Sequence, residues 1–381
     1  MTLAMGTRHS FGLFLRPMTL ELGWGRELFG FAMAVQSLVW GASQPFAGMV
    51  ADRFGAGRVL IGGAILYICG VILMAYSTTG AMFTAAAVLV GIALSGTTFS
   101  IVFGVAGRAF PPEKRSNALG IISAAGSFGQ FAMVPLAQTL IGWQGWFVAL
   151  LMVGCFLTLI IPLSTALVED RSQVAASGGT LTMGEAIREA FADRGYWLLT
   201  GGYFVCGFQV TFIGVHFPAY VVDRGLSVEV GTIALALIGL FNIAGTYTAG
   251  RLGAHRSKKG LLAAIYLSRS VVFLLLLALP SEPWVMFAFA ASIGFLWLST
   301  VPLTNGLVGQ MFGVRYLSTL GGVVFFSHQL GSFTGVWLGG YLFDRTGSYN
   351  TIWVASVALG IVAAVVNLLV NERRAPSPHA A

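Results

Sequence analysis

The sequence predicts an all-α membrane protein in which twelve transmembrane helices form two pseudo-symmetric halves of six. Three observations predict this fold. Charged residues make up only 9% of the 381-residue chain and its mean hydropathy is +0.83, whereas soluble domains carry about 25% charged residues. Apolar stretches long enough to cross a bilayer recur along the whole chain, and motifs of the first half recur in the second.

The apolar stretches give the order of the helices, because a bilayer core about 30 Å thick requires roughly 20 apolar residues per helix. The predicted spans are 3–20, 27–50, 59–77, 80–107, 117–140, 145–168, 196–222, 229–250, 260–279, 284–311, 318–343 and 349–370. A polar stretch with Gly, Ser and Ala at its centre separates six spans from six, and is typical of a linker. We expect an N-terminal half at 1–168, a linker with a short helix at 169–195, and a C-terminal half at 196–381.

The basic residues predict the orientation of the helices in the membrane. Fifteen Lys and Arg residues lie in one set of loops and tails, against four in the other set: Arg16, Arg26, Arg224 and Arg345. Basic residues favour the cytoplasmic side. We therefore expect both termini and the linker to be cytoplasmic, in a multi-pass protein of the cell's inner (plasma) membrane.

The two halves share local motifs at a nearly constant spacing. Three pairs of segments match at shifts of 198, 202 and 201 residues: 51–58 with 249–256, 126–131 with 328–333, and 6–17 with 207–218. Six-helix halves related in this way are parallel repeats about an axis along the membrane normal, with the substrate near the midplane between them. The first span has fewer residues before Gly6 than the seventh has before Gly207, so we expect a truncated first helix. We favour a misplaced start, and the alternative is a chain that begins inside the membrane.

Several classes of protein are disfavoured by the remaining composition. The net charge of +7 is spread over short loops without a basic stripe, which argues against nucleic acid as a partner. Cys69, Cys155 and Cys206 lie inside apolar stretches without metal or redox spacing. No catalytic trio or phosphate-cradling loop is present, so we expect neither an enzyme nor a cofactor or metal, and energy from a gradient instead of ATP.

The stretch GMVADRFGAGR at 48–58 resembles the signature loop between helices 2 and 3 of the major facilitator superfamily. Gly48, Asp52, Arg53 and Arg58 match its pattern, and RAFPPEKRSNALG at 108–120 looks like the family's loop between helices 4 and 5. Within the family, GTRHSFGLFL, GWGRELFG, VHFPAYVVDRGLS and SHQLGSF resemble the bacterial monocarboxylate and oxalate/formate exchanger branch. In span 229–250 the chain has no arginine, although carriers of this branch often keep one there.

The resemblance implies a monomeric secondary active transporter that moves a small organic solute by alternating access. The branch implies a carboxylate anion, with protons as a coupling ion. Two alternatives stay open: a transporter or exporter of another small molecule, and a membrane receptor or sensor of the same fold that does not transport. The import or export direction and the mode of coupling do not follow from the sequence.

Arg8 is the first candidate for a substrate contact. A charge inside a membrane span is costly and marks a functional site by default. The resemblance implies that the first helix lines the cavity, where a guanidinium would clamp a carboxylate through two parallel hydrogen bonds. The alternative is an arginine whose charged head reaches the membrane edge.

Further polar residues inside the spans complete the predicted site. The substrate-binding candidates besides Arg8 are Gln209 (its repeat partner), His328, Gln329, His216 and Asn305. His216 is also a candidate gate or interface residue, and a neutral His328 could carry a coupling proton. Candidates for support or coupling are His9, Arg269 and Asn242, with packing or helix contacts as the alternative roles.

The family's signature loop predicts a conformational latch at the cytoplasmic ends of the helices. Its members are Gly48, Asp52, Arg53, Arg58, Arg251 and Arg256. Charges at helix ends can pair in one state and separate in the other. The second half has Gly250 where the first has Asp52, so the latch should be one-sided.

Overall fold

The computed structural model describes residues 1–98, 101–102, 112–165, 183–312 and 317–372. Within these ranges the chain is helical apart from short turns and loops. The helices of the first half are α1 (Thr2–Leu22), α2 (Arg26–Phe54), α3 (Ala56–Ala75), α4 (Gly80–Thr97), α6 (Pro112–Leu157) and α7 (Ile160–Thr165). Those of the second are α9 (Arg194–Asp223), α10 (Val228–His255), α11 (Lys258–Ala278), α12 (Pro283–Leu296), α13 (Thr300–Phe312), α14 (Leu317–Thr346) and α15 (Asn350–Leu368).

These helices confirm the predicted fold class. Helix α6 holds two of the predicted spans, joined at Gly145, whose φ of 79° lies in the left-handed region that glycine adopts readily. The predicted span at 284–311 is broken into α12 and α13. A short helix, α8 (Met183–Ala192), occupies the end of the predicted linker, and the rest of that linker lies largely outside the described residues.

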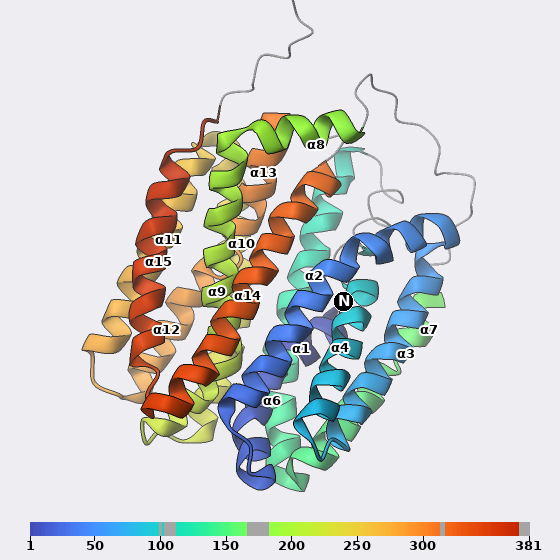
Figure 1. The fold of residues 1–381 in the computed structure, drawn as a ribbon, viewed down its shortest axis with the longest axis vertical. Helices are drawn as coiled ribbons and strands as arrows, with labels where there is room; N and C mark the ends of the chain where they lie inside the picture. Colours follow the sequence, from blue (N-terminus) through green and yellow to red (C-terminus); the bar gives the residue numbers. More distant parts are fainter. Residues whose placement is uncertain (99–100, 103–111, 166–182, 313–316, 373–381) are drawn as a thin grey trace, which may run out of the picture.

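Figure 1 shows the helices of the first half on one side of the bundle and those of the second half on the other, with α8 lying across one end. The two groups meet where α2 packs on α14, α10 on α6, and α1 on α9. Within each group α1 packs on α6 and α9 on α14, the pairing expected of a repeat. Arg8, Gln329 and Arg26 lie along these seams.

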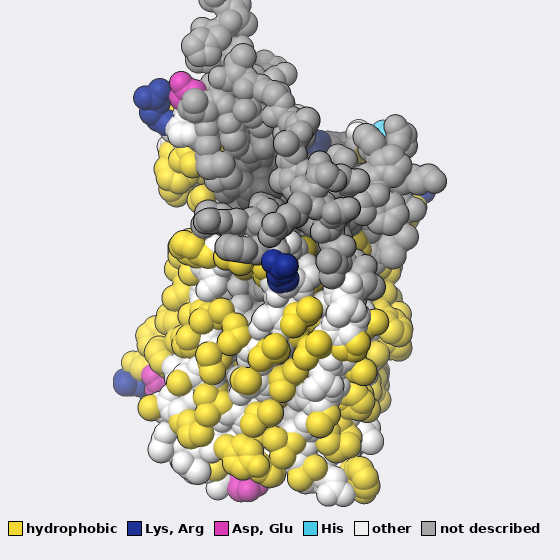
Figure 2. Space-filling model, turned by 90° about the vertical axis from the view of Figure 1, so that its right-hand side faces the viewer, with side chains coloured by type: hydrophobic (Ala, Val, Ile, Leu, Met, Phe, Trp, Pro, Cys, Tyr) yellow, Lys and Arg dark blue, Asp and Glu magenta, His cyan; other side chains and the backbone are white. Residues whose placement is uncertain are grey.

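Apolar side chains cover the face of the first half that is turned outward (Figure 2), as a lipid-facing surface requires. Eight helical stretches of the described residues are long and apolar enough to cross a membrane, and one of them, Ala124–Thr165, has room for two crossings. Helices α1, α2 and α14 have the length of a span but are less apolar. These three helices carry Arg8, Ser37, His328 and Gln329, so polar residues are concentrated at the seam between the halves.

Close helix contacts at the seam depend on glycine. A Cβ at Gly12 of α1 would collide with the backbone oxygen of Gly214 on α9. Within the second half, Cβ atoms at Gly207 and Gly331 would collide with the carbonyl oxygens of His328 and Phe204. Small residues allow membrane helices to approach this closely.

Candidate functional site between the two halves

A chain of polar side chains crosses from the first half to the second through Arg8. The Arg8 guanidinium on α1 donates to the Ser37 hydroxyl on α2 at 3.0 Å. The side-chain amide of Gln329 on α14 donates to the Ser37 carbonyl at 2.9 Å, and the Gln329 side-chain oxygen lies 3.1 Å from Nδ1 of His328. The structure therefore brings three predicted residues, Arg8, His328 and Gln329, into one cluster. We call these three residues and Ser37 the Arg8 cluster.

The Arg8 cluster is buried and only partly satisfied. Arg8 is 7% exposed, Gln329 2% and His328 8%. Nε of Arg8 and Nε2 of His328 are buried without a hydrogen-bond partner. Within the described part of the chain, the ion pair found is between Arg26 and Asp223, so no carboxylate neutralises Arg8. A buried cation and an open imidazole nitrogen can each accept a ligand's polar group.

Aromatic rings and a thiol surround His328. Its ring lies parallel to that of Phe325, with centroids 5.8 Å apart, and 4.9 Å from that of Tyr203 on α9. The Cys206 thiol forms a hydrogen bond with the Thr300 hydroxyl, 3.2 Å away, at the start of α13. Apolar walls next to polar groups suit a small organic molecule with one charged end.

Gln209, the repeat partner of Arg8, lies apart from the Arg8 cluster. Its amide group donates to the Ser356 carbonyl on α15 at 2.9 Å, and its side-chain oxygen accepts from Arg269 at 3.3 Å. Both ends of this side chain are thus used inside the second half. A role in substrate contact for Gln209 stays a prediction.

Arg269 is fully buried on α11 and holds backbone carbonyls. Its guanidinium donates to the carbonyl oxygens of Leu296 and Trp297 at 2.7 and 2.5 Å, where α12 ends. Carbonyl contacts of this kind agree with a support role for Arg269, which stays a prediction. Asn242 on α10 contacts the same place: its side-chain oxygen accepts from the Leu298 backbone N–H at 3.0 Å.

Two other predicted residues lie outside the Arg8 cluster. His9 is partly exposed on a different face of α1, and among the described residues no hydrogen bond joins it to the cluster. Asn305 is exposed on α13, and its amide group donates to the Val301 carbonyl one turn earlier. The roles of both residues stay predictions.

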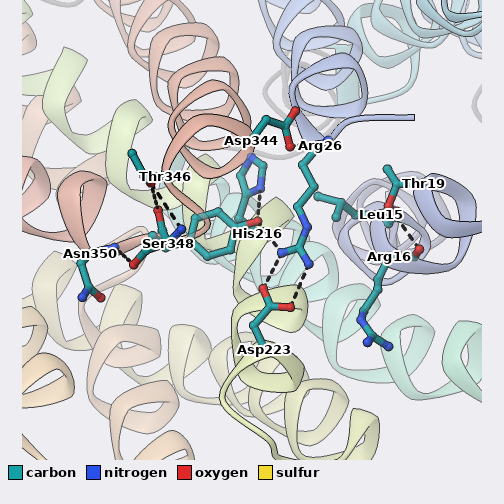
Figure 3. A network of polar contacts seen from close by, with 11 residues as sticks. Leu15, Arg16, Thr19, Arg26, His216, Asp223, Asp344, Thr346, Ser348 and Asn350 are labelled. Carbon is teal, nitrogen blue, oxygen red and sulfur yellow. Dashed lines mark hydrogen bonds and ion pairs between the residues drawn. The ribbon is translucent and has the colours of Figure 1, made fainter. Parts of the chain in front are cut away.

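A second polar network closes one end of the seam, which we call the Arg26 end. Arg26 at the start of α2 reaches across to Asp223 at the end of α9, with contacts of 2.5 and 2.8 Å (Figure 3). The same guanidinium donates to the Tyr349 hydroxyl at 3.0 Å, and its carbon lies 3.8 Å from the centroid of the Phe343 ring. The network thus ties one residue of the first half to three of the second.

His216 lies behind this network, buried on α9. Its Nε2 lies 2.8 Å from the Val336 carbonyl and its Nδ1 lies 3.1 Å from the Tyr349 hydroxyl. Because a carbonyl oxygen only accepts, Nε2 carries the hydrogen, and Nδ1 of the neutral ring accepts from Tyr349. Both ring nitrogens are used at the Arg26 end, as the predicted alternative of a gate or interface residue requires.

Asp344 of α14 completes the network by capping a helix of the other half. Its carboxylate accepts from the backbone N–H groups of Arg26 and Glu27 at 3.0 and 2.7 Å. These groups belong to the first turn of α2, where free donors and the helix dipole favour an anion. Beside this contact Glu27 accepts from the Trp337 indole at 3.3 Å.

The structure describes only part of the predicted latch. The side chains of Asp52 and Arg53 lie outside the described residues, while Arg58, Arg251 and Arg256 are exposed. Gly48 has open space around it. The latch therefore stays a prediction.

Sequence reasoning missed Ser37, Arg26, Asp223, Tyr349 and Thr300. Ser37 is one of many hydroxyl residues in apolar spans, and nothing in its local sequence distinguishes it. Arg26 and Asp223 flank loops, where charges are expected for topological reasons. Arg26 could have been singled out from the sequence, because it is one of only four basic residues in its set of loops.

Two groups of helices that meet along a buried polar seam are the architecture of a two-repeat membrane transporter. The chain matches the profile of the Major Facilitator Superfamily over residues 1–336, and it belongs to this family. The family resemblance inferred from the motifs is thereby confirmed.

Curated relatives resemble the chain over nearly its full length. It is 25% identical to the uncharacterized MFS-type transporter YcxA of Bacillus subtilis (strain 168), over 98% of this chain and 93% of that protein. It is 21% identical to the oxalate:formate antiporter of Oxalobacter formigenes, over 98% and 89%. Its identity to monocarboxylate transporter 13 of Bos taurus is 25%, over 93% and 83%.

A solved structure supports the same fold. A bacterial homologue of the human lysosomal transporter Spinster, crystallised in an inward-facing and occupied conformation, superposes with a TM-score of 0.80. The match covers 99% of this chain and 96% of that chain at 15% identity. At this identity the similarity concerns the fold alone.

Proposed function

We propose that this transporter carries a small organic anion of the carboxylate class and binds it at the Arg8 cluster. One observation carries the proposal: Arg8 is buried at the seam of the halves, with a single side-chain hydrogen bond to Ser37 and no carboxylate partner among the described residues. A carboxylate is the ligand that a guanidinium fork matches in two parallel hydrogen bonds.

The position of the cluster suits transport better than static binding. Arg8 and Ser37 belong to the first half, while Gln329 and His328 belong to the second. A substrate held by both groups would move from one side of the membrane to the other as the halves rock about it. In this account the open Nε2 of His328 receives the second polar group of the substrate or a coupling proton.

The relatives support the substrate class only at a distance. An oxalate:formate antiporter and a monocarboxylate transporter are both similar to the chain over most of their lengths.

The proposal includes a monomer in the inner membrane with both termini cytoplasmic and the halves at 1–168 and 196–381. A different small molecule as substrate is the second candidate, because the predicted span 229–250 has Asn242 and no arginine, although carriers of this branch often keep an arginine there.

A ligand screen tests the proposal directly. Purified protein is heated with small monocarboxylates, small dicarboxylates and uncharged analogues of matching size. A ligand that binds only the native state raises the melting temperature. We expect stabilisation by at least one carboxylate and none by its amide, followed by uptake of the same carboxylate into proteoliposomes. Equal stabilisation by acid and amide would contradict an anion site.

A further inference from the structure

The tenth membrane span is interrupted in its middle. Helix α12 ends at Leu296 and α13 begins at Thr300, so Trp297, Leu298 and Ser299 form an open turn between them. An interrupted helix frees backbone groups that water cannot satisfy inside a membrane. In transporters such interruptions are retained where other parts of the protein satisfy the freed groups.

Two buried side chains satisfy this turn from two different helices. Arg269 donates to the carbonyls of Leu296 and Trp297, where the positive charge also complements the C-terminal end of α12. Asn242, which is 2% exposed, accepts the Leu298 N–H. One residue thus supports the carbonyls and the other supports the amide.

The turn fixes Thr300, which contacts α9 beside the Arg8 cluster. Thr300 is the first residue after the turn, and it is fully buried. Its hydroxyl holds the Cys206 thiol at 3.2 Å, on the side of α9 that also carries Tyr203 against the His328 ring. A shift of the turn would therefore move Thr300 away from Cys206 and loosen the packing beside His328.

Asn242 also connects the turn with the other half. Its amide group donates to the Ser127 hydroxyl on α6 at 3.0 Å. A second bond crosses the same seam without touching the turn: the Gln130 amide donates to the Leu235 carbonyl at 3.1 Å. The α6–α10 contact thus holds one bond that reaches the turn and a matched one that does not.

We propose that Arg269 and Asn242 are positioning residues of the site. They hold the tenth span open at 297–299, and Asn242 transmits the position of α6 in the first half to Thr300 and the His328 side of the Arg8 cluster. The importance of these residues for transport rests on the proposed function. The placement of Thr300 can be measured without a substrate.

Cys206 serves as the native reporter. Cys69 and Cys155 are exposed, so their replacement by serine leaves the buried Cys206 as the single thiol. The alkylation rate of Cys206 by a small permeable maleimide then reports how firmly Thr300 covers it. The variants are Asn242→Ala, Ser127→Ala and the control Gln130→Leu, each compared with its parent at equal distance below its own melting temperature.

We expect Asn242→Ala and Ser127→Ala to raise the alkylation rate about three- to tenfold, the range for the loss of one hydrogen bond. Gln130→Leu should leave the rate unchanged. A purely local packing role of Asn242 would leave Ser127→Ala without effect, since Ser127 lies in the other half. Unchanged rates in both Asn242→Ala and Ser127→Ala would overturn the proposal.

Arg269 is tested by rescue. Arg269→Gln should raise the rate of Cys206 alkylation, and Arg269→Lys should restore it in part, because an ammonium still donates to carbonyls. If the Arg269 variants or Asn242→Ala fail to fold, the Ser127→Ala and Gln130→Leu pair decides alone. If no carboxylate stabilises the protein but the alkylation rates change as expected, the proposed substrate class is rejected. The assignment of Arg269 and Asn242 to the turn is then still supported.

Discussion

Arg26 of α2 and Asp223 of α9 form a two-point ion pair between the halves, with contacts of 2.5 and 2.8 Å. The pair is partly exposed, at 12% and 26% of the two side chains, so solvent weakens it. Its surroundings add Tyr349, Asp344 and the ring of Phe343 to the same arginine. This concentration of contacts indicates a lock that must open for the Arg26 end of the seam to separate.

Charge reversal tests the lock. Arg26→Asp and Asp223→Arg each place like charges face to face, which costs several kcal/mol, so each should slow transport by at least about tenfold. The double variant restores an ion pair without the contacts to Tyr349, and it should recover part of the rate. The measurement is uptake into proteoliposomes at matched protein amounts. A double variant no faster than the slower single variant would rule out the lock.

Glycine contacts give a stability prediction. Gly207→Ala places a methyl group against the His328 carbonyl, so the packing of α9 on α14 must shift, at about 1–3 kcal/mol. The control is Gly201→Ala on the same helix, where a Cβ meets no atom within 4 Å and alanine favours the helix. We expect a lower melting temperature for the first variant only. Equal melting temperatures would show that the helices accommodate the methyl group.

Topology reporters test the predicted orientation. A reporter fused after Arg374 or inserted within 172–180 should read as cytoplasmic, and one within 223–228 as external. On this orientation the Arg26 end faces outward. The reverse pattern would place the Arg26–Asp223 lock on the cytoplasmic side and would reject the inference from the basic residues.

The signature loop predicts an effect on rate without an effect on affinity. Asp52→Asn should slow transport and leave substrate affinity within a few-fold, because the residue biases conformations. Binding to purified protein and uptake into proteoliposomes are measured on the same preparation. Normal rates with a large loss of affinity would remove Asp52 from the latch.

The helix order was predictable because bilayer thickness fixes the length of every span. The interruption at 297–299 was not, since its stability comes from Arg269 and Asn242, which lie elsewhere in the chain. The sequence identified both residues as candidates for support. It did not predict which residues Asn242 contacts, and it did not predict that Ser37 belongs to the site. Local sequence cannot show which hydroxyl among many will face a distant guanidinium.

The repeat predicted related positions but not related environments. Arg8 and Gln209 correspond at a shift of 201. In the second half the cation is on the third helix of the repeat and engages Gln209. In the first half the cation is Arg8 itself, with Tyr67 close to it. Gln209 does not join the Arg8 cluster because both ends of its side chain are bonded within the second half, to Ser356 and Arg269.

The affinity of Arg8 variants for an anionic substrate tests the central claim most directly. A hydrogen bond to a charged group contributes about 1.5–3 kcal/mol, so Arg8→Gln should weaken binding roughly 10- to 100-fold. Arg8→Lys should restore the affinity only in part, because a point charge lacks the fork of the guanidinium. Binding is measured on purified variants whose melting profiles match the parent. Parental affinity in Arg8→Gln would show that Arg8 does not bind the substrate, and the anion site would lose its main support.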